Sequence, residues 1–142
     1  MHVLLVSHGK LAEGLLDTLS LFAKENIKDV LSIGLKDGES QEDFKKRAKK
    51  ILPILSKDEK FIILADIVGG SPLTNISNML YEEGLIDRAV ILGGMNLALA
   101  LTTLLLKDQI EPKELTEKVL YDGKASIQEL VLNNSDNEDD DL

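Results

Sequence analysis

The chain has 142 residues, of which 44% are hydrophobic and 29% charged, and its formal net charge is −9. This length and composition predict one soluble domain, and 4% aromatic residues with no Trp predict an aliphatic core. The absence of Cys excludes a disulfide scaffold and Cys-ligated metal sites, and the acidic charge argues against nucleic acid as a partner.

The first half of the chain predicts two strands, each followed by a helix. Residues 3–6 form a continuous apolar run, which is typical of a strand buried on both faces. Apolar residues recur at helical spacing over residues 11–22, and residues 30–35 predict a second strand. The second helix is expected to take Ser40 as its N-cap, and Pro53, late in this helix, predicts a kink or an end.

The second half of the chain continues the alternation of strand and helix. Residues 61–65 and 89–92 predict two further strands in apolar segments. The helix between them is expected to have Ser71 as its N-cap and Pro72 as its first residue, and to stop at Gly84.

The C-terminal part predicts helices over residues 96–106 and 112–121, with Asn96 as the cap of the first. Residues 126–132 fit either a helix end or an edge strand. Residues 133–142 are almost entirely Asn, Ser, Asp and Glu, and we expect an acidic disordered tail there. One folded domain is therefore predicted over residues 1–132.

The order of these elements predicts an α/β fold with an open, mostly parallel sheet and helices on both faces. We expect a strand order of about 2-1-3-4, and residues 126–132 could add an antiparallel strand at the C-terminal edge. Ligands of such sheets bind outside the carboxyl ends of the strands. The residues that follow each strand are therefore the candidates for function.

Two side chains with matching chemistry follow adjacent strands of this sheet. His8 follows the first strand and Asp66 the third. A neutral imidazole nitrogen can attack phosphorus and leave again, so His8 is the candidate nucleophile. Asp66 could hold the other ring nitrogen and stabilise the cation formed on transfer. A surface histidine without a role is the alternative, but the nearby Asp and glycine loop favour function.

The loop after the third strand is the candidate phosphate site. Gly69 and Gly70 permit a close approach of the backbone to a ligand, and a helix that begins at Ser71-Pro72 directs free N–H groups into the crevice. A plain glycine turn with a helix cap is the simpler interpretation. The spacing matches neither a P-loop nor a dinucleotide-binding fingerprint, so nucleotide binding is poorly supported.

Three further polar residues lie near the predicted strand ends. Ser7 could bind phosphate or simply turn the chain, and Asn96 is expected to cap a helix and shape the crevice. His2, at the start of the first strand, is expected to have no chemical role. We expect no metal site, because neither histidine lies near an acidic cluster.

Three sequence segments around this edge carry a family resemblance. They read Val-Ser-His-Gly-Lys-Leu-Ala-Glu-Gly-Leu at 6–15, Asp-Ile-Val-Gly-Gly-Ser-Pro-Leu-Thr-Asn at 66–75 and Gly-Gly-Met-Asn-Leu at 93–97. In this order and spacing they resemble the signatures of the mannose-type enzyme IIA domains of the bacterial sugar phosphotransferase system, the mannose, fructose and sorbose family. The resemblance covers nearly the whole predicted fold.

The resemblance implies a phosphocarrier. His8 would take a phosphoryl group from the phosphocarrier protein HPr and pass it to an enzyme IIB subunit, which phosphorylates sugar entering through membrane IIC and IID subunits. Asp66 would orient His8, and Ser71 would lead the phosphate-facing donors of the loop. No cofactor is needed, because the donor already carries an activated phosphoryl group. The resemblance also implies a homodimer that exchanges a C-terminal antiparallel strand, with residues 126–132 as the candidate.

Some features depart from the family pattern or leave alternatives open. Leu73 stands where the family often has Phe, and no IIB domain follows, so we expect IIB to be a separate chain. We expect a cytoplasmic protein that could sit at the membrane transporter complex, because the chain shows neither a signal peptide nor a membrane-spanning segment. The alternatives are a phosphoryl donor to dihydroxyacetone kinase and a regulatory module of the same fold. The Gly-Gly-Ser-Pro loop and the presence of both His8 and Asp66 favour the transport phosphocarrier.

Overall fold

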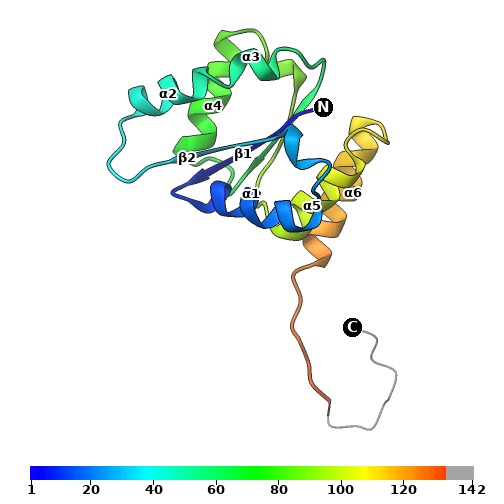
Figure 1. The fold of residues 1–142 in the computed structure, drawn as a ribbon. Helices are drawn as coiled ribbons and strands as arrows, with labels where there is room; N and C mark the ends of the chain where they lie inside the picture. Colours follow the sequence, from blue (N-terminus) through cyan, green and yellow to red (C-terminus); the bar gives the residue numbers. More distant parts are fainter. Residues whose placement is uncertain (134–142) are drawn as a thin grey trace.

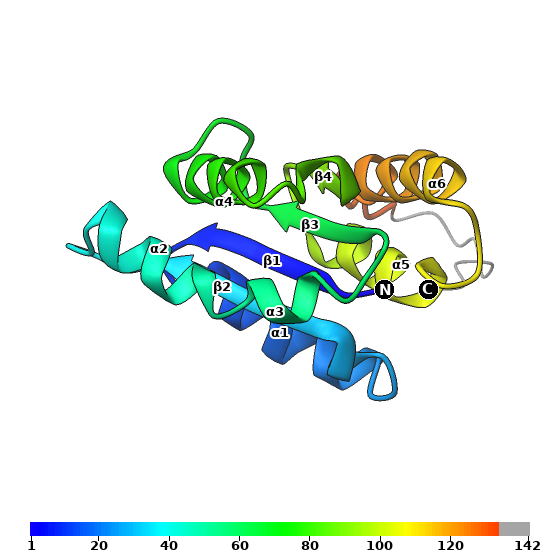
Figure 2. The same cartoon turned by 90° about the horizontal axis from the view of Figure 1, so that it is seen from above.

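A four-stranded sheet lies between two layers of helices in the computed structural model (Figure 1, Figure 2). The structure describes residues 1–133, so nearly all of the predicted acidic tail lies outside the described residues. The elements are β1 (Val3–His8), α1 (Leu11–Phe22), the 3₁₀ turn η1 (Ile27–Asp29), β2 (Val30–Leu35), α2 (Gln41–Lys49), α3 (Leu52–Leu55), β3 (Phe61–Ala65), α4 (Ser71–Glu82), the 3₁₀ turn η2 (Ile86–Arg88), β4 (Ala89–Leu92), α5 (Leu97–Leu106) and α6 (Pro112–Ala125).

The strand order β2-β1-β3-β4, with every pair parallel, confirms the predicted α/β class and topology. β1 and β3 are the two central strands, and Val6 pairs with Ala65 near their carboxyl ends. Their side chains from Val3 to Val6 and from Phe61 to Ala65 are buried, as expected for strands covered on both faces.

Alternate residues of β1 supply the two halves of the core. Val3 and Leu5 pack with α1, α5 and α6, whereas Leu4 and Val6 pack with α2, α3 and α4. Figure 1 shows these two groups of helices on opposite sides of the sheet. Each fully buried aliphatic side chain contributes about 1.5–3 kcal/mol, so the two layers fix the central strands firmly.

Local sequence signals explain several helix boundaries. The Ser40 hydroxyl accepts a hydrogen bond from the Asp43 N–H at 3.1 Å, and the Asn96 side chain accepts one from the Leu99 N–H at 2.9 Å. The predicted second helix is interrupted after Lys49, and Pro53 lies in the first turn of the short helix α3. Within residues 1–133, no helix has the length and apolar character needed to cross a lipid bilayer.

Three predicted boundaries at or after the third strand differ from the structure. Gly70, not Ser71, is the N-cap of α4, with extended backbone angles of φ −74° and ψ 155°. α6 continues to Ala125, four residues beyond the predicted end. Residues 126–133 form no strand within this single chain, so the antiparallel edge strand is absent from its described part.

Candidate functional site

His8 and Asp66 meet at the carboxyl edge of the sheet. His8 is the last residue of β1, and Asp66 follows β3 directly, so the parallel pairing of these strands brings the two together. Their contact is 2.8 Å between His8 Nδ1 and Asp66 Oδ2. The His8 side chain is 47% exposed and that of Asp66 only 14%, so the ring faces outward from a largely buried carboxylate.

Asp66 holds His8 at two points with a single oxygen. Oδ2 accepts hydrogen bonds from the His8 backbone N–H, at 2.9 Å, and from His8 Nδ1. Oδ1 accepts a hydrogen bond from the Ile67 N–H at 2.8 Å. Burial raises the pKa of Asp66, but the hydrogen bonds from His8 and Ile67 outweigh it, and the net pKa lies below its ordinary value. Asp66 is therefore an anion near neutral pH.

The anionic carboxylate determines which nitrogen of His8 is available for chemistry. A carboxylate can only accept, so the hydrogen in this contact lies on Nδ1 and the lone pair of the neutral ring lies on Nε2. Among the described residues, the ring makes no other hydrogen bond than the one from Nδ1. Nε2 is thus the unpaired nitrogen of an outward-facing ring, and its lone pair is the one that a neutral His8 could use in an attack on phosphorus.

Gly70 leaves room for the His8 ring at the start of α4. A Cβ on Gly70 would lie 2.7 Å from His8 Cε1, the ring carbon between the two nitrogens, which is closer than real Cβ contacts. No side chain caps α4, so the free N–H groups of its first turn remain available beside the ring. Free N–H groups and the positive end of a helix dipole are features that favour an anion, here beside the His8 ring.

Two other glycines shape the loop that carries Gly70. Gly69 has φ +86°, a left-handed conformation that favours glycine. A Cβ on Gly93 would lie 2.3 Å from Val68 Cγ2, so the bare backbone after β4 makes space for this loop. The Gly94 N–H also donates to the Asp66 carbonyl at 3.1 Å, which ties the two loops together.

The other predicted site residues take different positions. Ser71 is exposed in the first turn of α4, and Pro72 is buried behind it. Ser7 is fully buried, and its hydroxyl accepts the Ala12 N–H at 2.8 Å, so it secures the start of α1. The Asn96 side chain caps α5 and donates to the Gly123 carbonyl at 3.3 Å, and no hydrogen bond joins it to His8 among the described residues.

A close backbone approach under the His8 loop was not predicted. A Cβ on Gly34 in β2 would lie 1.9 Å from the carbonyl oxygen of Gly9, and Gly9 itself has φ +55°. The Gly9 N–H donates to the Leu35 carbonyl at 2.8 Å. A glycine inside a strand is the sequence signal for such an approach, and Gly34 carried it.

A second His–Asp pair lies at the opposite end of β1. His2 Nδ1 lies 2.9 Å from Asp58 Oδ2, which also accepts the His2 backbone N–H at 2.6 Å. The arrangement repeats that of His8 and Asp66, but the segment 56–61 that carries Asp58 contains no glycine, and Asp58 shares a hollow with Glu111 and Pro112 at the start of α6. Hydrogen bonding to one carboxylate oxygen therefore does not by itself distinguish the candidate site.

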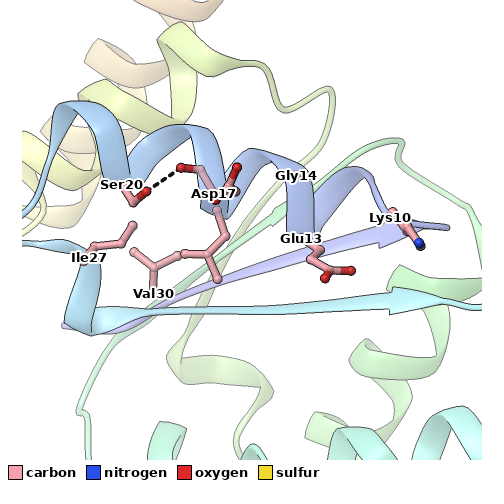
Figure 3. Close-up of a pocket in the computed structure, with 8 residues that line it drawn as sticks. Lys10, Glu13, Gly14, Asp17, Ser20, Ile27 and Val30 are labelled. Atoms are coloured by element: carbon pink, nitrogen blue, oxygen red, sulfur yellow. Dashed lines mark hydrogen bonds between the residues drawn. The ribbon is translucent and has the colours of Figure 1, made fainter.

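A hollow of about 620 Å³ lies between α1 and β2, and His8 is not among the residues that line it (Figure 3). Figure 3 shows Glu13 and Ser20 on one side of it and Ile27 and Val30 on the other. A second hollow of about 500 Å³ is lined by Gly9 and Lys10, which follow His8, and by residues that include Gly34 and Arg47. Exposed apolar side chains also follow His8 and Asp66 closely in the chain, namely Leu11, Ile67 and Val68. Among the described residues, no three His, Asp or Glu side chains come together in a way that could hold a metal ion.

Comparison with protein families finds one match over most of the chain. The family model EIIA-man, described as the PTS system fructose IIA component, matches residues 2–120. This range contains all four strands and the complete site at their carboxyl edge. No curated protein sequence matches the chain.

Solved structures share the fold along almost the whole length. Phosphotransferase system component EIIA from Streptococcus agalactiae has a TM-score of 0.74 and 25% identity, covering 90% of this chain and 95% of that one. The PTS IIA protein associated with the fucose utilization operon from Streptococcus pneumoniae has a TM-score of 0.74 and 27% identity, with 90% and 91% covered. A sigma-54 interaction domain protein from Enterococcus faecalis, at 15% identity, TM-score 0.70 and coverage of 89% and 92%, shares the fold alone.

Proposed function

This chain belongs to the EIIA-man family of phosphotransferase system IIA components, and we propose that it carries a phosphoryl group on His8 between HPr and an enzyme IIB subunit. The observation that supports this role is the hydrogen bond between His8 Nδ1 and Asp66, which leaves Nε2 free beside the N-terminus of α4. In the proposed pathway, IIB would phosphorylate a sugar that enters through membrane IIC and IID subunits.

The proposed transfer is an in-line displacement between two histidines. The lone pair of His8 Nε2 forms a bond to phosphorus while the bond from phosphorus to the donor's ring nitrogen breaks, and the donor nitrogen keeps that electron pair. The Nδ1 hydrogen stays in place, so the His8 ring becomes cationic and Asp66 stabilises this charge. Passage to IIB is the same displacement with His8 as the leaving group.

The loop at Gly70 and Ser71 would hold the phosphoryl oxygens during both displacements. Phosphoryl transfer depends mainly on positioning and charge stabilisation. The N–H groups in the first turn of α4 and the exposed Ser71 hydroxyl follow Gly70, which lies against the ring, and they are the donors that we propose for both. Ser7 has a buried hydroxyl that already accepts from Ala12, so we assign it to the support of α1 rather than to phosphate.

Small proteins are better candidates for partners than a free sugar at this edge. The ring of His8 is exposed, and Leu11, Ile67 and Val68 around it are exposed as well. An exposed apolar rim around a reactive group suits docking of another protein surface, whereas a sugar site needs a concave pocket with several polar groups.

We also propose that the chain works as a homodimer. All four residues of β4, Ala89–Leu92, are apolar yet only half-buried, whereas β3 is buried throughout. Residues 126–133 leave α6 without forming a strand, and Ile127, Leu130, Val131 and Leu132 among them are exposed. Exchange of this segment with a second copy would cover the β4 edge and bury these side chains.

The test of the function is phosphoryl transfer from phosphoenolpyruvate through enzyme I and HPr, read as intact mass. We expect one acid-labile phosphoryl group on the wild type and none on His8→Ala. His2→Ala is the matched control, because His2 has the same contacts to a carboxylate at the other end of β1, and it should accept the group normally. A folded wild type that takes no phosphoryl group from active donors would overturn the proposal.

A further inference from the structure

The outer surface of α2 carries a concentration of positive charge in an acidic protein. Seven of the 16 basic residues lie between residues 45 and 60, although the net charge of the chain is −9. Four lysines of this group lie within about 140° around the axis of α2 and its C-cap. They are Lys45, Lys46, Lys49 and Lys50, and we call them the basic face.

This face points away from the core and lacks internal neutralisation. Phe44 and Ala48 are buried on the opposite side of α2, and three of the four lysines are exposed, with Lys45 half-buried. Within residues 1–133, none of the four makes an ion pair, and the acidic residues of the first turn, Glu42 and Asp43, do not reach them. Arg47 on the same helix, by contrast, is paired with Glu39.

The spacing of these lysines weakens the helix that carries them. Lys45 and Lys49, and likewise Lys46 and Lys50, stand four residues apart, where like charges repel one another. The negative end of the helix dipole attracts cations in the last turn, which favours Lys49 and Lys50 at their positions. It does not offset the repulsion of each from the lysine four residues before it. An external anion would relieve the repulsion.

The sequence supplies a matching anion. Five acidic residues lie beyond the described part, and no basic residue follows Lys124. They are Asp136, Glu138, Asp139, Asp140 and Asp141. Each exposed ion pair contributes little binding free energy, and added salt weakens its attraction. Several ion pairs on one segment nevertheless add up to stronger binding.

A second copy is the source that the arrangement favours. α6 packs on α5 in the layer opposite to α2, and Figure 1 shows residues 126–133 running away from α2. We propose that the basic face of α2 binds the acidic segment 136–141 of a second copy of this chain, a contact that does not depend on phosphoryl transfer.

Carbodiimide cross-linking of the full chain tests this contact. The reagent joins a carboxylate to a lysine amine as an amide, with the lost water taken up by the carbodiimide. In a mixture of ¹⁴N- and ¹⁵N-labelled chains, we expect cross-links between residues 136–141 of one isotope and the basic face of the other. They should be lost at about 0.5 M salt, where screening is strong. Cross-links confined to one isotope, or spread evenly over all exposed lysines, would overturn the proposal.

A pair of charge variants tests the contact without any reagent. The triple variant Lys46→Gln, Lys49→Gln, Lys50→Gln should shift the amide NMR signals of residues 136–141. The matched triple Lys24→Gln, Lys113→Gln, Lys124→Gln removes the same charge from other exposed positions and should leave these signals in place. Equal shifts in the two triples would mean that the segment senses only net charge, which contradicts a specific face.

Discussion

A single oxygen of Asp66 fixes both the backbone and the ring of His8, and this contact decides how the residue can react. The sequence predicted the pairing, because parallel strands bring the residues after β1 and β3 to one edge. It could not predict that the His8 N–H and Nδ1 share one oxygen, since this depends on the side-chain rotamer. For the same reason the sequence did not predict the hydrogen bonds between His2 and Asp58, and no chemical role was expected for His2.

Removal of the Asp66 carboxylate should slow transfer without unfolding the protein. The Asp66→Ala variant loses the group that orients Nδ1, and we expect the rate of phosphorylation by phospho-HPr to fall about 10²-fold through misplacement of the ring. Asp58→Ala removes the equivalent carboxylate from His2 and should transfer at the normal rate. Rapid-quench measurement of both variants checks this, and a normal rate for Asp66→Ala would remove its assigned role.

The lowered pKa of Asp66 also predicts how stability depends on pH. Its contribution is present above the ordinary carboxyl pKa of about 3.9 and is lost as the pH falls through the lower folded-state value. The free energy of unfolding of wild type should therefore exceed that of Asp66→Ala by more at pH 7 than at pH 3. Urea unfolding at the two pH values measures the gap, and a constant gap would contradict the hydrogen-bonded anion.

A side chain at position 70 should disturb the His8 ring directly. The Cβ of Gly70→Ala would lie 2.7 Å from His8 Cε1, so the ring must move from its place beside Asp66. We expect transfer to slow by about 10²-fold while the fold is kept. Gly14→Ala is the control, because its Cβ meets nothing within 4 Å on α1. Comparable rates for the two variants would show that the contact does not position the ring.

Helices and strands were predicted best where a local pattern decides them. Three strands, β2, β3 and β4, have the predicted bounds, because their mostly apolar segments begin after a charged residue and end before a charged residue or a glycine. The start of α4 was wrong by one residue, since Gly70 and not Ser71 is its N-cap, and the close approach of the His8 ring to Gly70 joins distant parts of the chain that no local pattern describes. Whether residues 126–132 form the predicted edge strand likewise depends on a partner surface that a single chain does not provide.

The start of α1 depends on Ser7, which the sequence analysis considered as a phosphate-binding residue. Ser7→Ala leaves the Ala12 N–H without its partner in a buried position, which costs about 1–3 kcal/mol. We expect a lower free energy of unfolding in urea and a phosphorylation rate close to that of wild type at 25 °C. A strongly reduced rate with unchanged stability would instead place the Ser7 hydroxyl on the phosphoryl group.

For the whole molecule, the exposed β4 edge and the extended segment after α6 predict assembly. Leu130 is 73% exposed in the single chain, and its replacement in Leu130→Asp should shift a dimer toward monomer in analytical ultracentrifugation. Tyr81→Asp, at an equally exposed position of 74%, should leave the dimer intact. A monomeric wild type at micromolar concentration, or dimers in both variants, would contradict exchange of this segment.

β1 spans the molecule with an anchored imidazole at each end, and this provides an internal spectroscopic reference. Temperature and bulk solvent affect the ring signals of both His2 and His8, since each ring is held by one carboxylate oxygen and its own backbone. A protein that docks at the carboxyl edge of the sheet touches only one of them. The difference between the two ring signals in a single NMR spectrum therefore reports occupancy of the His8 edge without any added label.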